Sequence, residues 1–205
     1  MADLVVGLTG GIGVGKTTVA LLLASHGAVV VDCDALGRVV VEPGGLAYEG
    51  VVARFGTGVV GADGAIDRPA LGRIVFADPD ALADLNAITH PAIDIEIGRA
   101  IAAAPVAAIV VLDMAVLAES RLGRGQYDIV VVVEAPLAVR LTRLAGRGVA
   151  ADDARRRIAA QASDAARRAI GDLFVDNGRD QRALARAVDA LWAELVRRGT
   201  AAPSA

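Results

Sequence analysis

A glycine-rich segment near the N-terminus constrains this chain more than any other feature of its sequence. The segment Gly10–Thr17 reads GGIGVGKT and matches every position of the pattern GxxxxGK followed by Ser or Thr. It follows the apolar run Leu4–Leu8 and opens the helix-compatible run Lys16–Ser25, which ends near Gly27, a residue typical of helix C-termini. Glycines in this context let backbone N–H groups and a helix N-terminus surround a phosphate group. The segment therefore predicts a phosphate-binding loop rather than an incidental glycine-rich turn.

Lys16 is the only lysine in the chain. A compact ammonium fits inside a backbone cradle and reaches the β- and γ-phosphates, whereas the wide planar fork of arginine would not replace it there. The Thr17 hydroxyl is expected to bind Mg²⁺. A guanine-binding Asn-Lys-x-Asp motif would need a second lysine, so a GTP-dependent switch is excluded. From the phosphate-binding loop itself we expect binding of ATP with Mg²⁺. The predicted ATP-binding residues of this segment are Gly11, Ile12, Gly13, Val14, Gly15, Lys16, Thr17 and Thr18.

Continuous apolar runs predict the strands of a sheet. Besides Leu4–Leu8, we expect strands at Ala28–Val31, Ala107–Leu112 and Ile129–Val133, and a fifth at Leu173–Val175. These runs do not alternate with polar residues, which is typical of strands covered on both faces in a parallel sheet. The sequence therefore predicts a three-layer α/β fold of the P-loop type, with a parallel five-stranded sheet and helices on either side.

The segments between these runs are mostly helical. The stretch 35–104 contains no comparable strand, and we expect a helical insertion there with a turn-rich gap at Gly56–Gly64. This insertion is a suitable place for a second-substrate pocket. The chain is expected to form one domain over 1–205, with a core at about 1–34, 105–135 and 172–200. One more helix is expected to run to Gln161, with Asp152 or Asp153 as its cap. The other expected helices are Leu46–Phe55, Ala70–Phe76, Pro79–Ile88, Ile93–Ala104, Pro136–Leu144 and Leu184–Val196.

Composition excludes several classes of function. The net charge is −3 and aromatic residues make up 3% of the chain, so we expect no nucleic-acid partner. Apolar runs are too short to span a bilayer, and the N-terminus lacks the cationic start of a signal peptide, so we expect a cytoplasmic protein without membrane contact. The single cysteine, Cys33, excludes an intramolecular disulfide and a multi-cysteine metal site. No surface for a protein partner can be recognised in the sequence.

Two aspartates follow the second predicted strand. Asp32 and Asp34 are expected at its carboxyl end, beside the strand that precedes the phosphate loop, where open α/β sheets bind ligands. Alternation along an extended Val31–Asp34 segment would point both side chains to the same side. The two carboxylates could orient a hydroxyl nucleophile, hold Mg²⁺, or do both. Asp34 could instead cap a helix that starts at Ala35.

Six segments of the chain, in their order and spacing, match a known pattern. They are Leu8–Thr17, Val31–Asp34 with Arg38, Val41–Gly44, Leu85–Pro91, Arg157–Gln161 and Val175–Gly178. Together they resemble the dephospho-CoA kinase family and cover nearly the whole chain. The resemblance implies a P-loop core, a helical CoA-binding region at about 35–104 and a mobile lid at about 136–163. It also implies transfer of the γ-phosphate of ATP to the ribose 3′-hydroxyl of dephospho-CoA, the final step of CoA biosynthesis.

The resemblance assigns an acceptor site. By matching position, Asp34 is expected to activate or orient the acceptor hydroxyl, and Arg38 and His90 to bind the acceptor; for His90 the alternative is a structural histidine at a helix end. Asp113 and Glu119 match two acids of a family segment that is expected to shape the acceptor side, but Ala115 stands where that segment commonly has proline. The predicted substrate-binding residues are Asp34, Arg38, His90, Asp113 and Glu119.

The lid-like segment supplies arginines that could neutralise charge on a transferring phosphoryl group. Of Arg140, Arg143 and Arg147, the last is the expected catalytic arginine, since its flanking glycines permit hinge-like backbone angles. The remaining assignments are ATP binding by Arg143 and Asn177, and Mg²⁺ binding by Thr17 and Asp32. The expected catalytic residues are Lys16, Asp34 and Arg147. Two further arginine groups, Arg155–Arg157 and Arg167–Arg168, are expected to form solvated helix faces.

Two other functions are compatible with these features. One is another P-loop kinase that acts on a nucleoside or a sugar-like alcohol, and a screen of acceptors would distinguish it. The other is a regulatory ATPase, which predicts partner-stimulated hydrolysis and no phosphorylated small product.

Overall fold

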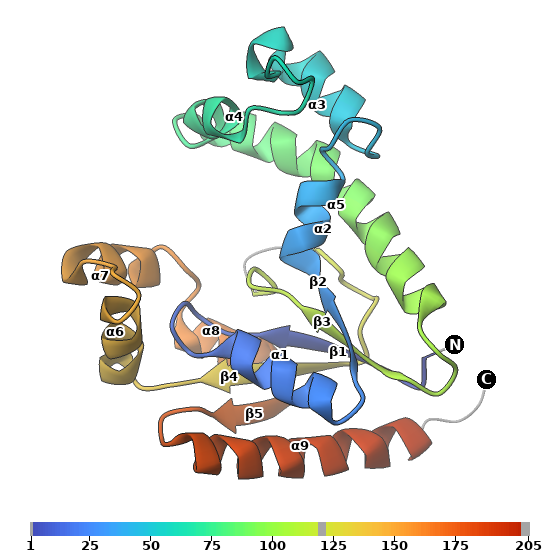
Figure 1. The fold of residues 1–205 in the computed structure, drawn as a ribbon, viewed down its shortest axis with the longest axis vertical. Coiled ribbons are helices and arrows are strands. Elements are labelled where there is room, and N and C mark those ends of the chain that lie inside the picture. The colour runs from blue at the N-terminus through green and yellow to red at the C-terminus, as the bar shows by residue number, and fades with distance from the viewer. Residues whose placement is uncertain (1, 119–121, 202–205) are drawn as a thin grey trace. The chain divides into compact units, whose positions relative to one another are not determined.

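The chain divides into two compact units, one made of Met1–Asp32 with Ala100–Ala205 and one made of Cys33–Arg99. The structure, a computed structural model, describes residues 2–118 and 122–201 (Figure 1). The first unit contains a sheet with helices, and the second is helical. No helix in these described ranges is long and apolar enough to cross a membrane.

A five-stranded parallel sheet forms the centre of the first unit. Its strands are β1 (Leu4–Thr9), β2 (Val29–Asp32), β3 (Ile109–Asp113), β4 (Ile129–Glu134) and β5 (Leu173–Asp176). Their order across the sheet is β2-β3-β1-β4-β5, and every pair is parallel, which confirms the predicted sheet. The expectation that β2 lies beside β1 is wrong, because β3 pairs with both. The long connection between β2 and β3 lets β3 return between them, so chain order does not give spatial order here.

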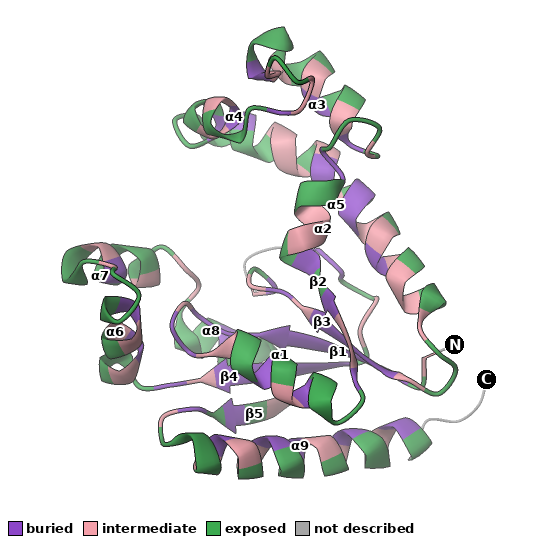
Figure 2. Cartoon of the chain, viewed as in Figure 1, coloured by how far each residue is buried: buried purple, intermediate pink, exposed green. Residues whose placement is uncertain are grey.

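Aliphatic residues cover both faces of the central strands. All six residues of β1 are buried, as are the first four of β3. Leu23 of α1 (Lys16–Ser25) and Leu195 of α9 (Gln181–Ala201) belong to the same core. Figure 2 shows the buried strands beside helices whose outer faces are exposed. This core fixes the strand before the phosphate loop and the helix after it.

Helix α1 has the predicted bounds and ends in a Schellman motif. The N–H of Ala28 donates to the carbonyl of Leu23 at 3.1 Å, and the N–H of Gly27 donates to the carbonyl of Ala24 at 2.9 Å. Gly27 has a φ of +107°, in the left-handed region that favours glycine. The predicted C-terminal role of this glycine is therefore confirmed.

Four helices lie in the part of the chain after β4. They are α6 (Leu137–Ala145), α7 (Ala151–Ala159), α8 (Asp164–Ile170) and α9. The prediction that Asp152 or Asp153 caps α7 is wrong, because Ala150 is the cap and both aspartates lie in the first turn, where they favour the helix dipole. No bounds were predicted for α8, which begins after Ser163. The Oγ of Ser163 accepts from the N–H of Ala166 at 3.1 Å.

The second unit is built from short helices and most of one long helix. The helices are α2 (Cys33–Val39), α3 (Tyr48–Phe55), the 3₁₀ turn η1 (Thr57–Val59), α4 (Arg68–Val75) and α5 (Pro79–Ala103). The prediction of two helices at Pro79–Ile88 and Ile93–Ala104 is wrong, since α5 runs through Pro91 without interruption. A proline removes only one helical hydrogen bond, and burial of Thr89, Ala92 and Ile93 around it favours continuation of the helix.

Candidate active site

The loop between β1 and α1 has open backbone N–H groups. Gly13 and Gly15 have φ angles of +83° and +90°, which other residues rarely adopt. No residue in the described part of the chain accepts a hydrogen bond from the N–H of either glycine. Lys16 and Thr17 lie in the first turn of α1, where N–H groups have no partner within the helix. These groups are available to the oxygens of a phosphate chain.

The loop borders a hollow of about 210 Å³. Besides the loop residues from Gly10 to Thr17 except Val14, its lining includes Ala115, Arg147 and Gln161. The side chain of Val14 is instead buried in the core, and Thr18, whose N–H donates to the carbonyl of Gly15 at 3.0 Å, does not line the hollow. The structure thus brings Lys16, Thr17 and Arg147 together.

Lys16 and Asp113 form an ion pair at the carboxyl end of the sheet. Each side chain is only 14% exposed. Asp113 is the last residue of β3, and its register partners are Leu8 on β1 and Asp32 on β2. Since adjacent strands are about 4.8 Å apart, the carboxylates of Asp32 and Asp113 are neighbours along one edge of the sheet. Asp113, which the sequence analysis assigned to the acceptor, therefore lies beside the phosphate loop.

Asp34 lies in the first turn of α2. Pairing between β2 and β3 ends at the Asp32–Asp113 pair, and the helix begins at Cys33. The expectation of an extended segment through Asp34 is therefore wrong, and so is the alternative that Asp34 caps a helix starting at Ala35. A strand that turns directly into a helix does not keep the alternation of side chains on which the first expectation depended.

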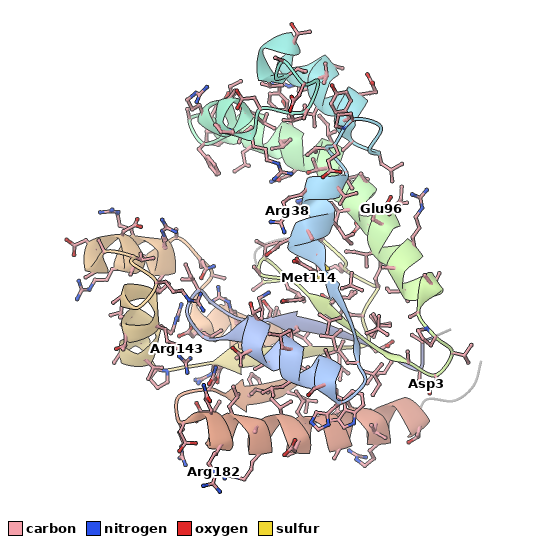
Figure 3. The ribbon with its side chains drawn as sticks, in the orientation of Figure 1. Asp3, Arg38, Glu96, Met114, Arg143 and Arg182 are labelled. Atoms are coloured by element: carbon pink, nitrogen blue, oxygen red, sulfur yellow. The ribbon has the colours of Figure 1, made fainter. Side chains whose placement is uncertain are left out.

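Arg143 and Asn177 hold the phosphate loop through its carbonyl groups. The Arg143 guanidinium (Figure 3) donates to the Val14 carbonyl at 3.0 Å and to the carbonyl and side-chain oxygens of Asn177 at 2.9 and 3.1 Å. Asn177, only 5% exposed, donates from Nδ2 to the same Val14 carbonyl at 2.7 Å. These contacts let both residues stabilise the loop through its backbone.

Arg140, one of three arginines predicted to neutralise phosphoryl charge, is buried beside the phosphate loop. Its side chain is 3% exposed, and its Nε donates to the Ile12 carbonyl at 2.9 Å. A Cβ at Gly11 would lie 2.6 Å from Nη2 of Arg140, so the arginine and the glycine occupy adjoining space. Among the described residues Nη2 has no hydrogen-bond acceptor.

The two arginines of α8 differ in exposure. Arg167 is 2% exposed and donates to the Ala162 carbonyl at 2.6 Å, so the expectation of a solvated face is wrong for this residue. Arg168 is exposed, and Glu134 accepts two hydrogen bonds from it at 2.6 and 3.0 Å, which raises the pKa of Arg168. Arg155–Arg157 are exposed, as predicted, and they form ion pairs along α7. Because no bounds were predicted for α8, the buried and exposed sides of this helix could not be told apart from the sequence.

The second unit contains a mostly apolar hollow of about 250 Å³. Its lining includes Val41, Leu71, Phe76 and Ile93, with Arg68 as a charged member that the sequence analysis did not single out. His90 lies inside α5, so the helix-end position expected in the structural alternative is wrong. Arg38 is in the last turn of α2 and is exposed.

Two further predictions concern Glu119 and metal binding. Glu119 lies outside the described residues. Within 2–118 and 122–201 no group of three or more His, Cys, Asp or Glu side chains could by itself hold a metal ion. At the edge of the sheet, Asp32, Asp113 and the Thr17 hydroxyl are the candidate metal ligands.

Comparison with known proteins identifies similar chains. The family model described as dephospho-CoA kinase matches residues 4–182. A dephospho-CoA kinase of Frankia casuarinae is 46% identical over 200 residues, which are 98% of this chain and 87% of that protein.

Solved structures give the same picture of the fold. A Thermus thermophilus protein superposes with a TM-score of 0.81 at 34% identity, over 95% of this chain and 99% of that one. A dephospho-CoA kinase from Campylobacter jejuni superposes with a TM-score of 0.70 at 21% identity, over 96% of this chain and 98% of that one, which shows a shared fold.

Proposed function

The chain belongs to the dephospho-CoA kinase family, whose reaction is the final step of CoA biosynthesis, and we propose that the residues gathered at its phosphate loop transfer the γ-phosphoryl group of ATP to the ribose 3′-hydroxyl of dephospho-CoA. The observation that carries this proposal is the hollow in which open N–H groups, Lys16 and Arg147 meet. In the reaction the hydroxyl oxygen forms a bond to the γ-phosphorus, and the bond from that phosphorus to the bridging oxygen of ADP breaks. Positioning and charge stabilisation dominate such transfers.

Three kinds of hydrogen-bond donor bind the phosphate groups of ATP. The N–H groups of Gly13, Gly15 and the first turn of α1 hold the α- and β-phosphates. Lys16 leaves Asp113 and reaches the β- and γ-phosphates, and Arg147 neutralises the charge that spreads over the transferring group. Arg143 and Asn177 keep the loop in shape through its carbonyl groups.

Magnesium fits the edge of the sheet. Mg²⁺ in kinases is commonly held by one or two carboxylates together with substrate phosphates, so a preformed cluster of three acids is not required. The Thr17 hydroxyl with Asp32 or its register partner Asp113 supplies oxygen ligands of that kind. When bound, the ion neutralises charge on the phosphate chain.

Residues of the second unit bind and activate the acceptor. Asp34, on the first turn of α2, takes the proton of the 3′-hydroxyl as its oxygen attacks. Arg38 and His90 bind the anionic parts of the acceptor, and the apolar hollow beside Arg68 accommodates one of its less polar parts. A cytoplasmic location and the lack of a nucleic-acid partner stay predictions from the sequence, as does the role of Glu119.

Mass spectrometry of the products tests the function. The protein is incubated with MgATP and dephospho-CoA, and we expect ADP and a product that gains one phosphoryl group at the 3′ position, as phosphorus NMR would locate it. Adenosine and shikimate serve as competing acceptors. ATP consumption without a phosphorylated small product, or faster transfer to another acceptor, would refute the proposal.

A further inference from the structure

Two side chains hold the peptide groups on either side of Ile12. Gln161 Oε1 accepts a hydrogen bond from the N–H of Ile12 at 2.7 Å, and Arg140 Nε donates to the Ile12 carbonyl at 2.9 Å. Gln161 follows α7, and Arg140 is in α6, so both come from the stretch predicted as the lid. The proposed mechanism uses neither contact.

The contact with Ile12 fixes the orientation of the Gln161 amide. Because a backbone N–H can only donate, the side-chain atom that faces it is the oxygen, and the other branch is the NH₂ group with two donors. No residue in the described part of the chain accepts a hydrogen bond from this Nε2 atom. Gln161 lines the same hollow as Lys16 and Arg147. Its NH₂ group is therefore a neutral donor available to a ligand in that hollow.

The hydrogen bonds of the loop indicate which phosphate the Gln161 NH₂ group would contact. The N–H groups of Gly13 and Gly15 and of the first turn of α1 are open and serve the α- and β-phosphates. The N–H of Ile12, which lies before them in the loop, is already occupied by Gln161 and cannot also serve a phosphate oxygen. Gln161 thus replaces this N–H as a donor, next to Lys16 and Arg147, the two cations expected at the γ-phosphate.

We propose that Gln161 is a catalytic residue that holds the phosphate loop through Oε1 and donates from Nε2 to an oxygen of the γ-phosphoryl group. This inference rests on the proposed function, since it requires a nucleoside triphosphate in the hollow. A neutral amide adds no charge and takes up no proton, so its hydrogen bond persists while the group moves from ADP to the acceptor. Loss of one fixed donor to a transition-state oxygen lowers kcat by about 10²–10³-fold.

Gln161→Glu separates the two roles of the side chain. The glutamate has the same shape and keeps an oxygen for the Ile12 N–H, but it replaces the NH₂ donor with a negatively charged oxygen. We expect kcat to fall by about 10²-fold or more. The Kd of a non-hydrolysable ATP analogue should rise about tenfold or more, while the Kd of ADP, which lacks the γ-phosphate, should change less than about twofold. Gln181→Glu, at the exposed start of α9, is the matched control and should change none of these values.

Other outcomes would overturn the proposal. Wild-type kcat in Gln161→Glu, or equal losses of affinity for ADP and the ATP analogue in the uncharged Gln161→Met, would show that Gln161 only holds the loop. Thermal melting checks the fold, and Gln161→Met, which is uncharged, gives the same comparison of the two nucleotides if the glutamate variant does not fold. The affinities need no acceptor, so they judge Gln161 even if the wild-type protein fails to phosphorylate dephospho-CoA, which would refute the proposed function alone.

Discussion

The ammonium group of Lys16 pairs with the carboxylate of Asp113, the last residue of β3. The lysine belongs to the phosphate loop and the aspartate to the strand beside β1, so the fold itself brings them together. With each side chain 14% exposed, the pair is largely withdrawn from water. A phosphate chain in the hollow offers Lys16 a second anionic partner and leaves the Asp113 carboxylate available to a cation.

Replacement of Lys16 tests the phosphate loop. Lys16→Met removes the charge that follows the γ-phosphoryl group, so kcat should fall about a hundredfold or more. Lys16→Arg should be nearly as inactive, because the planar guanidinium does not fit the cradle. Steady-state kinetics measures both, with circular dichroism as the control for folding. Near-normal turnover of a folded Lys16→Met protein would contradict the role of the loop.

Asp113→Asn tests the carboxylate beside the loop. The asparagine keeps the shape of the side chain but removes the charge. We expect the Mg²⁺ concentration for half-maximal activity to rise several-fold and saturating Mg²⁺ to restore part of kcat, since the ion has lost a ligand or a nearby anion. A Mg²⁺ titration of kcat measures this. An unchanged Mg²⁺ dependence together with a raised KM for dephospho-CoA would instead support the role that the sequence analysis gave Asp113.

Arg147 and Arg143 should affect different properties of the protein, the first turnover and the second ATP binding and stability. Arg147 lines the hollow, so Arg147→Ala should lower kcat about a hundredfold and leave ATP affinity within about threefold of wild type. Arg143 holds the carbonyl of Val14 and the side chain of Asn177, so Arg143→Ala should weaken ATP binding and lower Tm. Isothermal titration with an ATP analogue, kinetics and thermal melting distinguish them. If Arg143→Ala alone loses kcat, the two assignments are reversed.

Buried Arg167 should be more important for stability than its neighbour. Arg167→Ala leaves a cavity and removes a donor to the Ala162 carbonyl, which should lower the free energy of unfolding by about 2–4 kcal/mol. Arg168→Ala removes an exposed ion pair with Glu134 that water screens, so it should lower the free energy of unfolding much less. Urea denaturation of both variants measures the difference. Equal losses would show that burial does not distinguish the two side chains energetically.

The features that the sequence predicted well are local. The loop and α1 follow from glycines, one lysine and an apolar run within a few residues of each other, and Gly27 marks the end of the helix. Strands buried on both faces read as continuous apolar runs, and all five were predicted. In these cases the residues that decide the structure are neighbours in the chain.

Contacts between distant residues could not be predicted in this way. Gln161 meets Ile12 across 149 positions, and this contact depends on tertiary packing that no local pattern records. The continuation of α5 through Pro91 depends on burial of its neighbours, which outweighs the local preference of proline. The place of β2 beyond β3 depends on a pairing between strands far apart in sequence. The resemblance to the family named the region of the site, but not these contacts.

The two aspartates around the end of β2 should have different effects on catalysis. Asp32 ends the strand beside Asp113, whereas Asp34 lies on the first turn of α2, so their side chains serve different positions. Asp34→Asn keeps the size of the proposed base but removes its basicity, and kcat should fall about 10²–10⁴-fold with little change in Tm. Asp32→Asn should act more mildly, and added Mg²⁺ should restore part of its activity. Measurement of kcat for both variants across a Mg²⁺ titration decides between them: an active Asp34→Asn beside an inactive Asp32→Asn would exchange the two roles.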